Sequence, residues 1–511
     1  MKTIATLFLA LFCSGVHSQS TTFQRTIGGT GQEYGTGIQT FDGGYIFAGS
    51  TNSFGAGLLD IYLVRTDSTG DTLWTKTYGG TNNDWAHAVI QTSDSGFVIT
   101  GTTKSYGAGQ FDIFLMKLNS SGTLQWEKTY GGNLDEFAFT VEQTNDHGFI
   151  IGGYTTTYGS GFMDCYFIKT DSLGSIQWNK VYGGANNDQV LRVIQNPDGG
   201  YTAAGYCYRN ASGALDILLM RTDSIGDTLW TKTFGTGGND YGYDVIATLD
   251  GGYILTGVLD QMNSVIIKTD SAGETTWTRS FSGGLYDEAY RIIQKSNGNY
   301  VFSGWTNKTA LDEDITLTSL DSSGNLLWLK TAGGFGMDQG SSVCSTSDGG
   351  FIVTATAKDF GAGDWDLMMC KTDSLGNFGC NQTSNMVSIV PATLNTSSFD
   401  LNITTGGSSS NVTMLTGSGG VITDACTVGF NENISSDNSI TIYPNPVSSG
   451  NVSIQSKQQI TRYELYNVNG ELLMSGIPNG NNGVSVPEEA GIYFVKIYSG
   501  KECFVKKLVK F

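Results

Sequence analysis

The stretch LWTKTYGG at residues 73–80 constrains the fold more than any other feature, because degraded copies of it recur along the chain. The copies lie about 50 residues apart, a period typical of β-propeller blades when the content is strand-like and the turns are Gly-rich. The aromatic residues that head the copies are Phe23, Trp74, Trp126, Trp178, Trp230, Trp277 and Trp328, with a broken echo at Phe378. We therefore predict an all-β fold with a seven-bladed β-propeller over residues 19–380.

The two ends of the repeat complement each other. Residues 21–29 match only the end of a copy, whereas the seventh copy reaches residues 371–377 and then departs from the pattern. We expect the N-terminal strand around Phe23 to pair with the strand that ends near Asp373. This pairing would complete the last blade and close the ring through main-chain hydrogen bonds.

One copy predicts four strands, at residues 73–78, 86–91, 96–102 and 112–118. Turns that open with Asp or Asn and end with Gly join them, as in β-hairpins. The strands are apolar on both faces, which fits blades that are stacked between two neighbours. The 70 glycines and only 6 prolines also favour many short strands joined by tight turns.

Charge and hydropathy exclude several kinds of partner. The chain has 28 basic and 47 acidic residues and a net charge of −19, which repels phosphate backbones. Nucleic acid is therefore not an expected partner. After the N-terminal leader, no segment reaches the roughly 18 uninterrupted apolar residues that a membrane-spanning helix needs, so we expect no transmembrane segment.

The N-terminus has the pattern of a secretory signal peptide at residues 1–18. Lys2 precedes an apolar run at residues 4–12, and Ser18 suits a cleavage position. Removal of this leader leaves an odd number of cysteines, so at least one thiol should be unpaired. Cys380 and Cys426 bracket a Ser/Thr-rich segment and are the candidate disulfide.

An acidic residue follows each head aromatic at a fixed distance. One interpretation is a ring of carboxylates that holds a cation, with calcium the possible cofactor; no other cofactor or metal is indicated. The other is that each carboxylate accepts backbone N–H bonds in the turn after Gly-Gly, and we favour it because calcium needs six to eight converging oxygens. The acids are Glu33, Asp84, Glu136, Asp188, Asp240, Asp287 and Asp338.

A second acidic position, occupied by Asn263 in copy five, opens the strand equivalent to residues 112–118 in each copy and is interpreted as a turn residue. The loops before it carry aromatic residues that are candidates for stacking on sugar rings, or that simply cover the adjacent hairpin. Copies four and six depart from the pattern there, and departures mark where function can be added. The candidate ligand-binding residues are Phe54, Tyr106, Tyr158, Tyr208, Trp305 and Phe360.

Residues 381–437 are rich in Ser, Thr, Gly and Asn and contain few large apolar residues. This composition is typical of a linker rather than of a domain with its own core.

Four blocks end the chain: ITIYPNP at 440–446, RYELYNVNG at 462–470, GIYFVKIY at 491–498 and KKLVKF at 506–511. In this order they resemble the C-terminal (type A, Por) sorting domain of type IX secretion substrates, over residues 438–511. Their alternating strands also predict a small β-sandwich. The motif residues are Tyr443, Pro444, Asn445, Pro446, Gly491, Tyr493, Lys506 and Lys507.

The resemblance implies export by the type IX secretion machinery to the extracellular space or the outer-membrane cell surface. The repeats likewise resemble the Gly-Gly/Asp-repeat propellers found on such cargo, some of which carry an endoglucanase-like label. That label assigns no catalytic residue in this chain.

No catalytic residues are predicted, because the sequence has no HExxH, CxxC, P-loop or dinucleotide motif, and nothing places His87 or His147 beside a nucleophile. We predict a secreted or surface-displayed binding or adhesion module, with a polysaccharide or surface glycan as its ligand. The alternatives are a polysaccharide-degrading glycoside hydrolase, which needs only two carboxyl groups about 5–10 Å apart, and a structural surface component. Asp312 and Glu313 break the repeat, but neighbours in one strand point to opposite sides.

Overall fold

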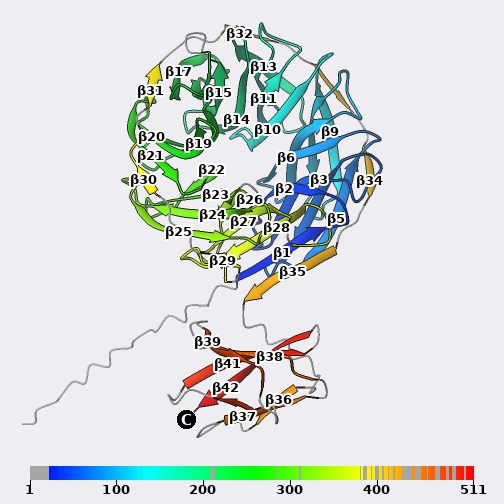
Figure 1. Cartoon of the computed structure of the whole chain (residues 1–511). Coiled ribbons are helices and arrows are strands. Elements are labelled where there is room, and N and C mark those ends of the chain that lie inside the picture. Colours follow the sequence, from blue (N-terminus) through cyan, green and yellow to red (C-terminus); the bar gives the residue numbers. More distant parts are fainter. Residues whose placement is uncertain are drawn as a thin grey trace, which may run out of the picture. The chain divides into compact units, whose positions relative to one another are not determined.

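The computed structural model contains strands and turns (Figure 1). It describes residues 22–428, except 209–212, 285, 310–311, 359, 380 and short stretches between 384 and 420, and residues 440–510 with short gaps. The predicted signal peptide at residues 1–18 lies outside the described residues. Within them, no helix is long and apolar enough to cross a membrane. The chain divides into two compact units, residues 1–429 and 430–511.

The described strands of the first unit form seven antiparallel sheets, which we number 1 to 7. Sheet 1 contains β2 (Glu33–Gln39), β3 (Tyr45–Thr51), β4 (Asp60–Thr66) and β5 (Thr72–Gly79). Sheet 2 contains β6 (Asp84–Gln91), β7 (Phe97–Thr103), β8 (Asp112–Leu118) and β9 (Leu124–Gly131). Sheet 3 contains β10 (Glu136–Gln143), β11 (Phe149–Thr155), β12 (Asp164–Thr170) and β13 (Ile176–Gly183). Sheet 4 contains β14 (Asp188–Gln195), β15 (Tyr201–Tyr208), β16 (Leu215–Thr222) and β17 (Thr228–Gly235).

The remaining three sheets follow the same plan. Sheet 5 contains β18 (Tyr241–Ala247), β19 (Tyr253–Leu259), β20 (Asn263–Thr269) and β21 (Thr275–Ser282). Sheet 6 contains β22 (Asp287–Gln294), β23 (Tyr300–Thr309), β24 (Asp312–Leu320) and β25 (Leu326–Ala332). Sheet 7 contains β26 (Asp338–Ser345), β27 (Phe351–Ala357), β28 (Asp366–Thr372) and the N-terminal strand β1 (Thr22–Gly28).

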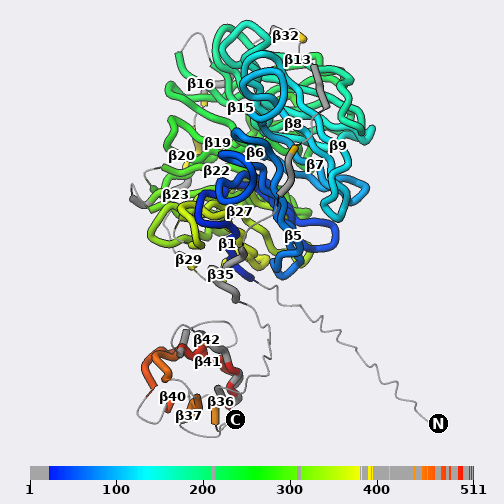
Figure 2. Tube along the Cα trace, turned by 90° about the vertical axis from the view of Figure 1, so that its right-hand side faces the viewer, coloured from blue at the N-terminus to red at the C-terminus, as the bar shows by residue number. Residues whose placement is uncertain are grey.

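The sheets follow one another around a centre, so the unit is propeller-like (Figures 1 and 2). The second strand of each sheet contacts the first strand of the next, from β3 with β6 through to β27 with β2. The first strands also contact one another in turn, and β26 contacts β2. The N-terminal strand β1 pairs with β28, with Phe23 opposite Lys371, as the sequence predicts.

Large side chains fill the space between neighbouring sheets, because both faces of a sheet are covered. In one core cluster, Ile46 and Leu63 of sheet 1 pack with Phe97 and Phe114 of sheet 2. Each head aromatic lies against a turn glycine of the next sheet: Trp74, for example, lies against Gly122, where a Cβ would come within 2.6 Å of the ring. Gly122 has φ of +74°, so both its conformation and its lack of a side chain are required.

The segment predicted as a linker, residues 381–437, differs from that expectation. Its described strands lie along the outer edges of the sheets, one strand per sheet, and we call them the belt. The belt strands are β29 (Gln382–Thr383), β30 (Ser388–Val390), β31 (Asn395–Ser397), β32 (Asn402–Thr404), β33 (Ser408–Asn411), β34 (Leu415–Gly417) and β35 (Val421–Val428).

The belt strands pair with the sheets in the reverse of their order along the chain. It pairs in turn with β25, β21, β17, β13, β9 and β5, and it ends with β35 on β1. Every pairing is antiparallel and uses main-chain groups, so polar residues serve as well as apolar ones. The composition therefore gave no sign of these strands. Their effect is to cover outer edges that would otherwise present unpaired N–H and C=O groups.

The candidate disulfide falls on residues that the structure describes only in part. Cys380 lies outside the described residues, and only the main chain of Cys426 is described, opposite Gln24. The side chain of Asn381 donates to Gln24 Oε1 at 2.8 Å, so the start and the end of the belt both reach Gln24. Cys165, Cys207 and Cys370 are buried within the strands of their sheets, as small apolar side chains are.

The second unit, described by itself, contains two small sheets. One has the order β36 (Ile440–Tyr443), β37 (Asn451–Ser456), β40 (Gly483–Ser485), and the other the order β39 (Leu472–Gly476), β38 (Arg462–Tyr466), β41 (Gly491–Ser499), β42 (Glu502–Lys510). A single hydrophobic cluster contains Val452 and Val484 from the first sheet and Leu465 and Val495 from the second. The predicted sandwich of two sheets agrees with this packing.

Shortening the chain to residues 19–380 removes the belt. We expect the shortened chain to unfold several degrees below a chain of residues 19–429 and to associate with increasing concentration, because the outer strands lose their edge partners. Thermal unfolding and light scattering measure the two effects. Equal unfolding temperatures and a monomeric shortened chain would show that the belt does not stabilise the fold.

Candidate functional site

The seven acids predicted after the head aromatics are buried, none being more than 5% exposed. Each accepts a hydrogen bond from a main-chain N–H of the preceding turn, at 2.6–2.9 Å. The donors are Gly29, Gly80, Gly132, Gly184, Thr236, Gly283 and Gly334. These are the bonds that the turn-stabilising interpretation requires, and we call these seven residues the framework acids.

The second acidic position lies close to the framework acids. Asp112 accepts from Gly109 N at 3.0 Å, and its Oδ1 lies beside Gly131, the glycine that precedes the Glu136 turn. Burial, with the charge of Glu136, raises the pKa of Asp112 to about 6, and burial with the charge of Asp164 does the same for Asp188. Across the described residues, no group of three or more His, Cys, Asp or Glu side chains is arranged to hold a metal ion. The calcium ring stays a prediction.

Sheet 5 departs from this arrangement in two positions at once. Asn263 replaces the second acid, and Ser282 replaces the glycine that the acid contacts elsewhere. In sheet 2, a Cβ on Gly131 would come within 2.0 Å of Asp112 Oδ1 and 2.6 Å of Glu136 Oε2. The one side chain at this position, that of Ser282, therefore occurs in the sheet that lacks the second acid.

Gly131→Ser should destabilise the protein by about 1–3 kcal/mol, because the new side chain overlaps two buried carboxylates. The matched control is Ser282→Gly, which introduces the usual residue into sheet 5 and should cost less than about 1 kcal/mol. Denaturant unfolding of both variants measures the difference. Equal losses of stability would contradict the overlap.

The raised pKa values of Asp112 and Asp188 predict a pH effect. These carboxyls bind protons more tightly when folded, so their contribution to stability is full below their ordinary pKa of 3.8 and is lost as the pH rises through about 6. Buried His87 has its pKa lowered to about 4 and acts in the opposite sense. The test is therefore the difference between the wild type and the D112N/D188N variant.

Between pH 7 and pH 5, the unfolding temperature of the wild type should rise relative to that of the double variant. Asparagine keeps an acceptor oxygen at both positions, and Asn263 occupies the position equivalent to Asp112 in sheet 5, so the fold should persist. Parallel pH profiles for the two proteins would show that these carboxyls do not titrate as described.

Four of the predicted ligand-binding aromatics contact neighbouring sheets or core clusters. The hydroxyls of Tyr106 and Tyr158 donate to the carbonyls of Gly79 and Gly131 in the preceding sheets, at 2.8 and 3.2 Å. Phe54 and Phe360 pack against core clusters. Tyr208 is 36% exposed, and Trp305 is half-buried.

A different set of residues lies around the centre, and sequence reasoning missed it. The residue directly after each framework acid is on an innermost strand, and all but Gln189 are at least partly exposed. We call these residues the inner ring: Tyr34, Trp85, Phe137, Gln189, Tyr241, Glu288 and Gln339. The sequence does contain a signal for these positions, because the residue type varies directly beside an acid that is repeated in every copy.

In sheets 2 and 3 the inner ring joins a continuous row of aromatic side chains, which we call the aromatic arc. Trp85 stacks on Phe111 with ring centroids 5.3 Å apart, Phe111 lies 5.2 Å from Phe137, and Phe137 stacks on Tyr154 at 5.0 Å. Trp85, Phe111 and Phe137 are partly exposed. None of these positions is needed for the turns, because residues of other types occupy them in the remaining sheets.

In sheet 6 the same positions carry acids. Glu288 lies opposite Trp305 across β22 and β23, and the hydroxyls of Tyr243 and Tyr290 donate to it. Burial and the charge of Glu313 raise the pKa of Glu288, although the tyrosine hydrogen bonds oppose the shift. Glu313 is 7% exposed and accepts from Gln339 Nε2 at 2.6 Å.

Further along the inner strands, charged side chains join three sheets. Arg192 of sheet 4 and Arg291 of sheet 6 both approach Asp244 Oδ1 of sheet 5, at 3.4 and 3.3 Å. Asp244 Oδ2 also accepts from Ile292 N at 3.0 Å. This network connects the first strands of the three sheets. The two arginines compensate the negative charge of Asp244.

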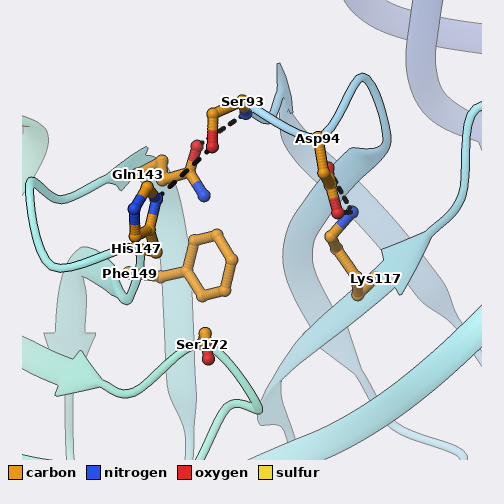
Figure 3. A pocket seen from close by; sticks show the side chains of 7 residues that line it. All are labelled: Ser93, Asp94, Lys117, Gln143, His147, Phe149 and Ser172. Carbon is orange, nitrogen blue, oxygen red and sulfur yellow. Dashed lines mark hydrogen bonds and ion pairs between the residues drawn. The ribbon is translucent and has the colours of Figure 1, made fainter.

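A shallow pocket of about 330 Å³ lies at the opposite ends of the strands, between the turns of sheets 2 and 3 (Figure 3). His147 lies on one side, near Ser93, and the ion pair of Lys117 with Asp94 on the other. Five other sheets have an equivalent ion pair of Lys or Arg with Asp, including Lys169 with Asp146. Because the ion pair recurs in most sheets, it has a structural role in the repeat. The pocket is therefore a weaker candidate binding site than the inner ring.

Residues 441–510 match the family described as a secretion system C-terminal sorting domain. The match confirms the resemblance of the tail, and the chain is exported by type IX secretion to the extracellular space or the cell surface. Of the motif residues, Tyr443 is exposed, Gly491 and Tyr493 lie in β41, and Lys506 and Lys507 lie in β42. Pro444, Asn445 and Pro446 lie outside the described residues.

Comparison with curated proteins gives no match. Among solved structures, a eukaryotic initiation factor aligns with 76% of this chain and 98% of its own, at 8% identity and a TM-score of 0.32. A puromycin hydrolase mutant complexed with PGG aligns with 66% of this chain and 58% of its own, at 11% identity and a TM-score of 0.30. Similarities at this level carry no argument about fold or function.

Proposed function

We propose that the first unit is a closed seven-bladed β-propeller that serves as a binding or adhesion module outside the cell, and that its ligand is a carbohydrate. The contacts that return from β27 to β2, and the pairing of β1 with β28, support the closed ring. The sorting domain supplies the route of export.

The aromatic arc is the observation that carries the binding proposal. Three of its rings, those of Trp85, Phe111 and Phe137, are partly exposed and lie side by side. The positions of the arc carry other residue types in other sheets, so the repeated turns do not require these rings. Aromatic faces combine a large apolar surface with electron-rich character, which suits them to the C–H faces of sugar rings. Several rings in one row match a polymer that presents successive sugar units.

The test mixes the chain of residues 19–429 with a panel of insoluble neutral polysaccharides and measures its depletion from solution. We expect saturable depletion by one polymer and at least about tenfold weaker binding by Trp85→Ala, since one central aromatic side chain can contribute 2 kcal/mol or more. The control is Phe41→Ala, which removes a 71% exposed aromatic at the opposite ends of the strands.

Absence of depletion by every polymer, or equal losses for both variants, would refute carbohydrate binding by the aromatic arc. Release of reducing ends during the same incubation would instead indicate a glycoside hydrolase.

A further inference from the structure

Sheet 6 carries a second feature that the aromatic arc does not explain. Glu288, Trp305, Asn307 and Glu313 lie together on strands β22, β23 and β24, and we call them the acidic corner. Among the inner-ring residues and the residues that precede the second acidic position, Glu288 and Glu313 are the only acids. The corner therefore gives one side of the ring a chemical character that the rest lacks.

The strand register places the four side chains on one face of sheet 6. Glu288 pairs with Trp305 across β22 and β23, and Asn307 pairs with Glu313 across β23 and β24. Directly opposite residues project to the same face of a sheet, and so do residues two apart in one strand. Trp305 and Asn307 are two apart, so the two carboxylates lie on either side of them on that face.

Among the described residues, the corner contains one buried acceptor that lacks a partner and two carboxylates whose donors are uncharged. Asn307 is 4% exposed, and its Oδ1 has no hydrogen-bond partner in the described part of the chain. Glu313 is 7% exposed and accepts from Gln339, an uncharged donor. No described lysine or arginine forms an ion pair with Glu288 or Glu313, in contrast to Asp244, which two arginines approach. A buried acceptor without a donor and buried carboxylates without a cation are both costly, so a ligand that donates hydrogen bonds and carries positive charge would stabilise the corner.

Aromatic side chains narrow the chemistry of that ligand. The Tyr243 and Tyr290 rings lie 4.7 Å apart beside Glu288, and Trp305 lies opposite it. Calcium needs six to eight oxygen ligands, and indole rings supply none. An ammonium group has three N–H donors and a positive charge that both carboxylates and aromatic faces attract. The net charge of −19 also favours a cationic ligand.

We propose that the acidic corner binds the primary ammonium group of an amino sugar and thereby selects partly deacetylated amino-sugar polymers. This inference rests on the proposed carbohydrate binding for its choice of sugar over other amines. The corner would recognise the amine while the aromatic arc contacts neutral sugar faces.

The experiment titrates the full secreted chain with glucosamine oligomers and with their N-acetylated counterparts, by calorimetry at pH 6. We expect the free amine form to bind at least about tenfold more tightly. Glu288→Gln and Glu313→Gln should remove this preference and change binding of the acetylated oligomer by less than about twofold. Asp364→Asn is the matched control, because Asp364 is an exposed acid at the same ends of the strands but outside the corner.

A further variant leaves both carboxylates unchanged, so its result does not depend on whether the glutamine variants fold. Trp305→Leu removes one aromatic face and should also weaken binding of the amine form. Equal affinities for the two oligomers, or a full preference retained by both glutamine variants, would overturn the proposal. Tighter, Glu288-dependent binding of a lysine-rich peptide would overturn the assignment to an amino sugar.

The two proposals fail in different ways. Trp85-dependent binding of neutral polysaccharides without any preference for amines would refute the acidic corner and leave the proposed function intact. Glu288-dependent binding of monomeric glucosamine without binding of any neutral polysaccharide would refute the aromatic arc and leave the corner intact.

Discussion

The main-chain pairing of β1 on both of its edges is the interaction on which the rest of the first unit depends. One edge of β1 pairs with β28 and thereby joins the first residues of the described chain to the last repeat. The other edge pairs with β35, the last strand of the belt. A single strand therefore completes the last sheet and also anchors the end of the belt, and each would expose an unpaired edge without it.

Packing between neighbouring sheets then connects each sheet to the next. Each head aromatic lies on a turn glycine of the next sheet, and the series includes Phe23 of β1 on Gly70. The framework acids stabilise the turns that precede the first strand of each sheet, because they accept hydrogen bonds from main-chain N–H groups there. With turns and sheet contacts satisfied by repeated residues, the positions directly beside them are free to vary. The aromatic arc and the acidic corner occupy such positions.

Much of this arrangement could be predicted from the repeat. The strand pattern, the position of β1 beside β28 and the role of the head aromatics follow from local spacing and turn residues. The belt could not be predicted, because its short strands bind through main-chain groups, and edge pairing leaves no apolar period in the sequence. The loop aromatics such as Tyr106 were predicted as candidate ligand contacts. In the structure the Tyr106 hydroxyl donates to a neighbouring sheet, and its ring packs against a core cluster.

The sequence by itself determined the all-β repeat, the acid and glycine positions of each turn, and the sorting domain that directs export, because these depend on residues close together in the chain. Only the tertiary structure decided which varied residues meet at the centre. Glu288 and Glu313 come from different strands of sheet 6, and Trp85 meets Phe137 across two sheets. Such neighbours depend on how the sheets stack around the cycle, and no spacing along the chain encodes that.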